Sequence, residues 1–447
     1  MEVSDVQEKP WGQKTPDEKL EHRLNAWLNP PISFASPEAE RSYKARVARL
    51  RDAILLEKTP DRVPVPLGTC VGYASTWGGL TPYDAMYDLE RMARVSIDFN
   101  LEFQPDAMVP PGGVAPLPGR VMDMLDHRVF CWPGHGVPKE VGLQYIEKEW
   151  MRAEEYDDFI ADPTDFLMRR FLPRTCGALE GLGRLSSVLD GSGYFVSWAR
   201  PEVTDSLERL IAAGKEMAGW LGRLFPIIGR LQSLGFPLAG GGFCQAPFDF
   251  LGNSLRGTKG LALDLFRCPD KVIEACHRLV PILIRAVTDN AGPEMPPCVM
   301  WPLHRGADGF MNVEQFKTLY WPGLRAVALG LIDEGLIPVF FGEGTLDSRL
   351  EIIAADLPKG KTVWLLDRTD MARAKATLGT VAALQGNVPL SLLQLGTPEA
   401  VRDYCASLIE VAAPGGGFLL DSGAALDQGR AENVHAMIQA AHDYGVY

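Results

Sequence analysis

The sequence predicts an α/β barrel of eight parallel strands, the (β/α)8 or TIM-barrel class, preceded by a helical N-terminal arm. Helix-period and short-strand signals alternate along most of the 447-residue chain. Three short apolar runs, residues 298–304, 336–343 and 361–367, each end in a polar side chain and are separated by helix-like segments. This pattern places ionisable groups at the C-terminal ends of strands, where β/α barrels assemble their active sites.

The domain division that we expect is a helical arm over residues 1–48 and a barrel over residues 49–447. Residues 17–28 have the apolar spacing of a helix, and Ser36 is placed to begin a second one that continues to about residue 56. We expect this arm to pack on the barrel or on a second copy of the chain in a homodimer.

The barrel strands are expected at eight places: 62–68, 106–110, 235–243, 298–304, 336–343, 361–367, 381–387 and 415–421. The prolines of the first are poor for an interior strand, because proline cannot donate to a strand ladder. Residues 120–132 alternate in a way that predicts two short strands around Asp126-His127. The clearest helices are predicted at 82–100, 269–290, 397–411 and 431–444.

Composition excludes several classes of function. The net charge is −13, and no basic run carries interleaved aromatics, so we expect no nucleic-acid binding. No apolar run approaches the roughly 18 residues of a membrane span, and the first residues have no apolar signal core, so we expect a cytoplasmic protein that does not enter a membrane. None of the eight cysteines forms a CxxC pair. Only Cys70 and Cys244 fall in strand-end loops, where a cysteine could act as a ligand or nucleophile.

The candidate catalytic residues are His304, Glu343 and Asp367, which follow three successive strands and are expected to converge at the barrel mouth. One imidazole and two carboxylates suit zinc, iron or manganese. Two alternatives stay open. One is a metal-free site with Glu343 as general acid or base, oriented by His304 or an arginine. The other is a structural ion pair of Glu343 with Arg305, Arg349 or Arg368. Thr369 or Asp370 is also well placed to cap the helix that follows.

Further residues are candidates for binding a substrate or cofactor. Arg305 and Arg368 could hold an anionic group. Tyr73, Trp77 and Phe248 could form an apolar wall for an aromatic substrate, although aromatic side chains in such loops also serve as ordinary packing. The other candidates stand at the ends of the last two strands: Asn387 and Ser422.

Five short motifs lie along the chain: Lys58-Thr-Pro-Asp-Arg-Val-Pro-Val, Gly386-Asn-Val, Gly396-Thr-Pro-Glu, Gly415-Gly-Gly-Phe-Leu-Leu-Asp-Ser-Gly and Glu432-Asn-Val. As a set they resemble the uroporphyrinogen decarboxylase superfamily, over about residues 48–447. The resemblance implies a (β/α)8 barrel. It also implies one of two chemistries: decarboxylation of the acetate arms of uroporphyrinogen, or methyl transfer between corrinoids and thiols or other acceptors with the help of zinc.

The features that the resemblance associates with true uroporphyrinogen decarboxylases are missing. These enzymes carry Arg-Gln-Ala-Gly-Arg after the first strand, Asp after the second and His after the eighth. This chain has Leu67-Gly-Thr-Cys-Val-Gly-Tyr, Val109-Pro-Pro-Gly-Gly and Asp421-Ser-Gly-Ala-Ala at those places. A substrate with eight carboxylates needs a ring of fixed cations, and the first loop offers none.

The corrinoid methyltransferase branch, by the same resemblance, binds zinc through His-x-Cys after the fifth strand and a further Cys near the end of the seventh. Here the fifth strand ends in Phe341-Gly-Glu343 and the seventh in Gln385-Gly-Asn387, so the thiolate set is not preserved. A metal would instead need the harder set of His304, Glu343 and Asp367.

The function expected from the resemblance is a corrinoid-linked methyltransferase or demethylase, which moves a methyl group between a small substrate and a corrinoid on a partner protein. Zinc or another divalent metal is the expected cofactor if the carboxylate set binds one. Glu343 with His304 and Asp367 would bind that metal or protonate the leaving group. Two alternatives remain: a decarboxylase whose carboxylated substrate is held by Arg305 or Arg368, and a non-catalytic binding barrel.

Overall fold

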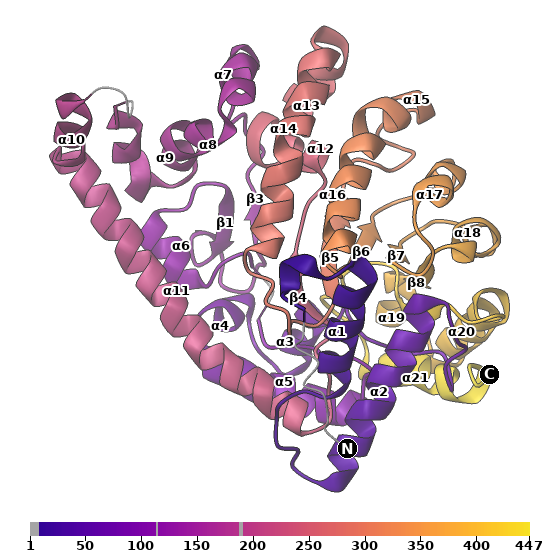
Figure 1. The fold of residues 1–447 in the computed structure, drawn as a ribbon. Coiled ribbons are helices and arrows are strands. Elements are labelled where there is room, and N and C mark those ends of the chain that lie inside the picture. Colours follow the sequence, from indigo (N-terminus) through magenta and orange to yellow (C-terminus); the bar gives the residue numbers. More distant parts are fainter. Residues whose placement is uncertain (1–8, 113–114, 187–190) are drawn as a thin grey trace, which may run out of the picture.

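A parallel sheet of six strands forms the centre of the molecule (Figure 1). The computed structural model describes residues 9–112, 115–186 and 191–447. The strand order, β4-β5-β6-β7-β8-β9, follows the chain, as expected of successive strand–helix units. The strands are β4 Gly240–Phe243, β5 Cys298–Leu303, β6 Ile337–Gly342, β7 Val363–Leu366, β8 Ala383–Val388 and β9 Phe418–Ser422.

Helices precede the sheet and fill the connections between its strands (Figure 1). Those before β4 are α1 Pro16–Leu28, α2 Pro37–Leu55, α3 Val71–Trp77, α4 Pro82–Tyr87, α5 Leu89–Phe103, α6 Gly119–Leu125, α7 Tyr156–Ala161, α8 Pro163–Phe166, α9 Leu172–Thr175, α10 Ser192–Trp198 and α11 Pro201–Ser233. Those after it are α12 Pro247–Phe250, α13 Gly257–Arg267, α14 Pro269–Thr288, α15 Val313–Gln315, α16 Trp321–Asp333, α17 Leu350–Asp356, α18 Met371–Thr377, α19 Leu390–Leu395, α20 Pro398–Ala412 and α21 Ala431–Tyr444.

The predicted helix starts are confirmed by their side-chain caps. Ser36 accepts a hydrogen bond from the backbone N–H of Ala39 and begins α2, and Thr397 accepts one from Ala400 and begins α20. Asp370 likewise caps α18. Each cap satisfies a backbone donor that the helix leaves unpaired and stabilises its helix by about 1 kcal/mol.

The six later strands of the predicted eight are present, whereas residues 62–68 and 106–110 form no strand, so the described residues show no closed barrel. Prolines explain part of this outcome, because Pro64 and Pro66 lack the N–H that a regular ladder requires. Single backbone hydrogen bonds remain. They run from Leu420 N–H to the Pro64 carbonyl, from Asp106 N–H to the Val65 carbonyl, and from Met108 N–H to the Pro237 carbonyl.

The prediction of two short strands in residues 120–132 was wrong in its first half. Residues 119–125 form the helix α6, and only β1, Phe130–Pro133, is a strand. It pairs in a small separate sheet with β2, Gly136–Val137, and β3, Gln144–Tyr145. The local alternation of apolar residues did not separate a short amphipathic helix from a strand.

The N-terminal helices α1 and α2 pack against the beginnings of the sheet strands. Their buried side chains, among them Trp27 and Tyr43, share one apolar cluster with the first residues of β5, β6, β7 and β8: Cys298, Ile337, Val363 and Ala383. The arm therefore covers one end of the sheet, as expected, and leaves the C-terminal strand ends to the loops. Helix α2 continues across the expected arm boundary between residues 48 and 49.

Side-chain alternation along the strands separates two faces of the sheet. Trp301, Phe340 and Trp364 lie on the face toward the connecting helices. The ring centroid of Phe340 is 5.1 Å from that of Trp301 and 4.5 Å from that of Trp364. The opposite, inner face carries the residues that pack on the arm, such as Cys298 and Ile337. Since successive side chains of a strand point to opposite faces, the inner face continues through every second residue to the strand ends.

Within the described part of the chain, no helix has the length and apolar character to cross a bilayer.

Candidate active site

His304 and Glu343 meet directly at the C-terminal ends of β5 and β6. Leu303 and Gly342 are the last paired residues of these neighbouring strands, so the next residue of each strand lies side by side with the other. Both belong by alternation to the inner face. His304 Nδ1 lies 2.9 Å from Glu343 Oε2, and the two side chains are 34% and 44% exposed. The pair is therefore hydrogen-bonded and open to solvent.

The charge of this pair favours a protonated imidazole. Burial on its own would lower the pKa of His304, but the hydrogen bond and negative charge of Glu343, together with the charge of Asp249, outweigh it and raise that pKa above 6.5. Because an ionised carboxylate only accepts, Nδ1 donates to Glu343, and Nε2 is the nitrogen left for another partner. An imidazolium oriented in this way can deliver a proton to a substrate atom.

Asp249, on α12, fixes the backbone that carries His304. Its carboxylate accepts from the backbone N–H groups of His304, at 3.2 Å, and Arg305, at 3.1 Å, and from the hydroxyl of Tyr320, at 2.6 Å. Burial raises the pKa of Asp249 in spite of these hydrogen bonds. Asp249 could not be identified from the sequence, because no local signal connects two positions 55 residues apart.

Asp367 does not join the pair. Alternation puts it on the inner face next to Glu343, but its Oδ2 accepts the backbone N–H of Gly344 at 2.9 Å and lies 3.5 Å from Nε of Arg368. Within the described ranges no three His, Cys, Asp or Glu side chains are grouped to hold a metal ion. Of the three predicted donors, His304 and Glu343 therefore lie together, and Asp367 is hydrogen-bonded to the loop after β6.

The two arginines proposed for anion binding have different surroundings. Arg305 is 6% exposed, and its guanidinium donates to Asn253 at 2.6 Å and Thr258 at 2.7 Å, with Asp249 at 3.6 Å. Because the Arg305 guanidinium is buried and hydrogen-bonded to protein groups, its position does not support the predicted role in substrate binding. The side chain of Arg368 is 75% exposed and remains accessible.

Tyr73 and Phe248 are packing residues in the structure, which favours the ordinary alternative over an apolar wall. Tyr73 is 2% exposed, its ring lies edge-on to Phe99 and Phe103, and burial raises its pKa to about 12. Phe248 is 1% exposed and lies against Tyr320. Both side chains stabilise the helix layer that surrounds the strand ends.

Asn387 and Ser422 are also occupied by protein partners. Asn387 donates to the carbonyl of Thr369 at 2.9 Å, and Ser422 donates to the carbonyl of Ala424 at 2.9 Å. Both are nearly inaccessible, at 8% and 0% exposure. Their position at the strand ends was foreseen, but the structure engages them in holding loops and leaves little surface for a ligand.

A buried carboxylate at the end of β9, Asp421, organises this side of the sheet. It accepts from Thr69 Oγ1 at 2.7 Å, Gln385 Nε2 at 2.8 Å and the backbone N–H groups of Gly68 at 3.0 Å and Ser422 at 2.8 Å. Burial raises its pKa, and the four hydrogen bonds oppose that effect. Asp421 therefore ties the loop after residue 67 to the last two strands.

The cysteines chosen as candidates are buried thiols. Cys70 is 0% and Cys244 4% exposed. Burial raises the pKa of Cys244 to about 12, and that of Cys70 moves in the same direction for the same reason, reinforced by the charge of Asp421. Neither side chain supplies a thiolate for catalysis near neutral pH.

Phe243 is a candidate that the sequence analysis missed. It ends β4, where it pairs in register with Met300, an inner-face residue that packs toward the arm cluster. Its side chain is nevertheless 59% exposed. An exposed ring on the inner face, beside the strand that leads to His304, offers apolar contact to a ligand. The one local signal was the glycine run Gly240-Gly-Gly before it.

A second polar region lies away from the strand ends, over residues 128–180. A hollow of about 500 Å³ is lined there by Arg128, Lys148, Glu149, Trp150, Arg152, Arg169, Arg170, Pro173, Arg174 and Glu180.

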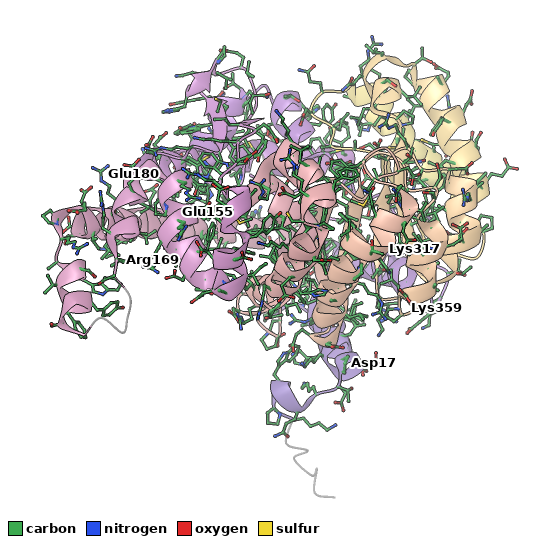
Figure 2. All side chains as sticks on the ribbon, turned by 90° about the horizontal axis from the view of Figure 1, so that it is seen from above. Asp17, Glu155, Arg169, Glu180, Lys317 and Lys359 are labelled. Atoms are coloured by element: carbon green, nitrogen blue, oxygen red, sulfur yellow. The ribbon has the colours of Figure 1, made fainter. Side chains whose placement is uncertain are left out.

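Most arginines of this hollow have carboxylate partners. Glu155 forms ion pairs with Arg174 and Arg170, and Glu180 forms one with Arg128. Figure 2 shows Glu155, Glu180 and Arg169 on this part of the molecule. The hydrogen bond from Arg174 lowers the pKa of Glu155 to about 2. This network is a structural one.

The fold and the pair at the strand ends define a class: an α/β protein that presents a hydrogen-bonded histidine–glutamate pair at the carboxyl edge of a parallel sheet. The family model for uroporphyrinogen decarboxylase (URO-D) matches residues 198–444, which is more than half of the chain. The protein therefore belongs to the uroporphyrinogen decarboxylase family.

A solved structure supports the same fold. It is that of a methyltransferase from Methanosarcina mazei, with a TM-score of 0.55 and 14% sequence identity, covering 90% of this chain and 98% of that one. At this identity the likeness concerns the fold. No curated protein matches the chain.

Proposed function

We propose that the protein is a methyltransferase or demethylase that moves a methyl group between a small substrate and a corrinoid carried by a partner protein. The observation that carries the proposal is the exposed His304–Glu343 pair at the strand ends. A solved methyltransferase of the same fold adds support. The buried guanidinium of Arg305 argues against a site built to hold many carboxylates.

In this proposal His304 is the acid and Glu343 its positioning residue. The bond between the methyl carbon and a heteroatom of the substrate breaks, and the heteroatom keeps the electron pair. His304 donates a proton to that atom, while Glu343 holds Nδ1 and stabilises the imidazolium before transfer. Asp249 keeps the backbone of His304 in place through its N–H. A general acid in this role contributes about 100- to 10,000-fold to the rate.

The corrinoid, when bound, supplies the nucleophile that accepts the methyl group. The exposed ring of Phe243 fits contact with a large flat ligand at the sheet edge. The metal that the resemblance led us to expect stays a proposal with two donors, His304 and Glu343. Asp367 accepts the backbone N–H of Gly344, and no third donor joins His304 and Glu343 in the described residues. The proposed reaction therefore includes no metal-dependent step.

We further infer that the two extended segments, 62–68 and 106–110, complete the ring that the six strands begin. The hydrogen bonds from Leu420 to Pro64, from Asp106 to Val65 and from Met108 to Pro237 run in the order that an eight-membered barrel requires. In that arrangement His304 and Glu343 stand at the barrel mouth.

The proposal is tested by incubating the purified protein with reduced free cobalamin and small O-, N- and S-methyl compounds, and following the absorbance of the cobalamin. Wild type is expected to transfer methyl from at least one class, and Glu343→Gln is expected to be slower by about 100-fold or more. No transfer from any class, or equal rates in the variant, would overturn the assignment.

A decarboxylase is the second candidate, favoured by the exposed guanidinium of Arg368, whose backbone N–H donates to the carbonyl of Gly344, the residue after Glu343. It predicts release of carbon dioxide from a small carboxylated compound without added cobalamin. Arg368→Gln would then raise KM while leaving the unfolding free energy within about 0.5 kcal/mol, because the side chain is on the surface. Methyl transfer without such release removes this candidate.

A further inference from the structure

A line of hydrogen bonds runs from the buried side chain of Arg305 to Gln245, a residue just after β4. Nη1 of Arg305 donates to Oδ1 of Asn253 at 2.6 Å, and Nδ2 of Asn253 donates to Oε1 of Gln245 at 3.1 Å. Nη2 of Arg305 donates to the hydroxyl of Thr258 at 2.7 Å. The guanidinium lies against Gly252, where an added Cβ would stand 2.6 Å from the guanidinium carbon. The glycine therefore leaves the room that the arginine occupies.

The arginine fixes the direction of each hydrogen bond in this line. A guanidinium has only donors, so the Asn253 atom that faces Arg305 is the amide oxygen, and the amide nitrogen of Asn253 then faces Gln245. The Gln245 atom that accepts from this nitrogen is in turn its own amide oxygen. The N–H₂ group of Gln245 is left over, and within residues 9–112, 115–186 and 191–447 it donates to no other protein group. Because Gln245 is half-buried, this N–H₂ group is available to a ligand.

Gln245 stands at the strand ends, close to the candidate pair. It lies two residues beyond Phe243, which ends β4 and pairs in register with Met300 of β5. Since alternate residues of a strand face the same way, Gln245 is on the inner face with Phe243, while Cys244 between them is buried. Continued past Phe243, the same register places Gln245 two residues short of His304, roughly 7 Å along the strand direction. A small molecule can therefore contact both side chains.

A π-helical turn holds Asn253 between Arg305 and Gln245. The turn, η6 Leu251–Arg256, follows α12 directly. Turns of this kind close their hydrogen bonds over one residue more than an α-helix does, and they are frequent at functional sites. The hydroxyl of Tyr145, from the small separate sheet, donates to the backbone carbonyl of Asn253. Asn253 is thus held by its backbone and by its side chain, so the orientation that it imposes on Gln245 is fixed.

We propose that Gln245 recognises an oxygen of the substrate that only accepts hydrogen bonds, such as a carbonyl or carboxylate oxygen. Arg305 and Asn253 are positioning residues that hold Gln245 in its donating orientation. The inference rests on the proposed function for one point alone, that the bound molecule is the methyl donor. Its acceptor oxygen then lies at Gln245, its apolar part against Phe243 and its methyl-bearing heteroatom at His304. An N–H group in place of the acceptor would set two donors face to face and leave both unpaired, so such compounds are disfavoured.

Two probes of equal size test the recognition: methoxyacetone, and 1-methoxy-2-methylpropane, in which CH–CH₃ replaces the carbonyl. Saturation-transfer NMR with the full chain gives the dissociation constant of each. Wild type is expected to bind methoxyacetone about fivefold more tightly, which is the contribution of one neutral hydrogen bond. Gln245→Met keeps the length of the side chain but has no N–H, and it is expected to bind both probes alike.

The matched control is Gln13→Met, at an exposed glutamine of the N-terminal arm, which should keep the wild-type preference. Wild type that binds the two probes equally, or that binds neither, overturns the proposal. A preference that survives Gln245→Met overturns it as well.

Reversal of the Gln245 amide tests the positioning role of Asn253. Asn253→Asp puts an acceptor where the amide nitrogen stands, so Gln245 is expected to turn its own N–H₂ group toward residue 253 and present its oxygen to the ligand. The preference for methoxyacetone is then expected to disappear although Gln245 itself is unchanged. A role of Asn253 in the fold alone would weaken the binding of both probes alike and leave their ratio at the wild-type value, which would refute positioning. Circular dichroism reports whether each variant folds, and Gln245→Met decides the recognition if Asn253→Asp does not.

Methyl transfer from the compounds of the activity test to reduced free cobalamin is measured on the same wild-type samples, which separates the two proposals. A binding preference for methoxyacetone without methyl transfer from any compound refutes the proposed reaction and leaves the recognition by Gln245 standing. Methyl transfer without a binding preference refutes the recognition and leaves the reaction standing.

Discussion

Glu343 and Asp421 are two inner-face carboxylates at the C-terminal edge of the same sheet, and their surroundings could hardly differ more. Asp421 is 0% exposed and accepts four hydrogen bonds. The Glu343 side chain is 44% exposed, and the partner of its carboxylate is the imidazole of His304. The two carboxylates thus occupy similar positions on the sheet, but they differ in the number of hydrogen-bond donors around them and in their exposure to solvent.

This difference shows how the same edge of one sheet can hold a carboxylate with a structural role and another that stays available to a substrate. A buried carboxylate is stable only when donors satisfy it, and once satisfied it has no acceptor left for a substrate. An exposed carboxylate with one imidazole partner keeps free acceptors and a partner that can be protonated. Asp421 therefore holds loops together, and Glu343 is the carboxylate that remains accessible to orient His304 in the proposed reaction.

The largest expected effect is the loss of activity in Glu343→Gln. The variant keeps a hydrogen bond to His304 but removes the negative charge that stabilises the imidazolium, so turnover is expected to fall by about 100-fold or more. The unfolding free energy should change by less than about 1 kcal/mol, because the pair is solvent-exposed. Methyl-transfer rates and urea unfolding measure the two quantities. A large loss of stability instead would make Glu343 a structural residue like Asp421.

The reverse outcome is expected for Asp421→Asn. In this variant an N–H₂ group replaces one carboxylate oxygen and faces a donor, such as the backbone N–H of Gly68 or Ser422, so a hydrogen bond is lost in a buried place. The unfolding free energy is therefore expected to fall by about 2–4 kcal/mol. Urea unfolding measures the loss. The control is Asp403→Asn, at an exposed aspartate of α20, which should change it by less than about 0.5 kcal/mol. Equal effects of the two substitutions would contradict the proposed division of roles.

The pH dependence of the reaction tests the role of the Glu343 charge. The pKa of His304 is raised above 6.5, so the stabilisation from its charged pair with Glu343 is complete below that value and is lost as the pH rises through the raised pKa. Activity that needs the imidazolium should therefore fall on the alkaline side of pH 6.5. In Glu343→Gln the residual activity should fall at lower pH, because the cause of the upward shift is removed. An unshifted profile would mean that His304 is not the acid.

The smallest expected effect concerns Phe243. In the proposed site its exposed ring contacts the ligand and contributes little to the core, so Phe243→Ala is expected to raise KM by about 3- to 10-fold with the unfolding free energy unchanged. Phe266→Ala is the matched control, because Phe266 is 80% exposed on α13 and should leave KM as it is. Steady-state kinetics of both variants decide whether the inner face of β4 belongs to the site.

Much of the fold could be predicted from local sequence signals. The caps at Ser36 and Thr397, the cap of α18 to within one residue, and the six later strands were located correctly, because a cap or a short apolar strand depends on a few neighbouring residues. The same signals failed at α6, where a seven-residue helix lacks enough turns to show its period. The prolines at 64 and 66 marked a poor strand in advance.

The candidate site was determined by the sequence only in part. Strand order and alternation were enough to bring His304 beside Glu343, since both follow the last pair of neighbouring parallel strands. Alternation alone also favoured Asp367, and the structure engages its carboxylate at the N–H of Gly344. Tertiary structure decided which strand-end groups stay accessible. Asp249 reaches His304 across 55 residues, and Asp421 reaches Gly68 across 353, because hydrogen bonds and burial depend on where distant segments meet in space.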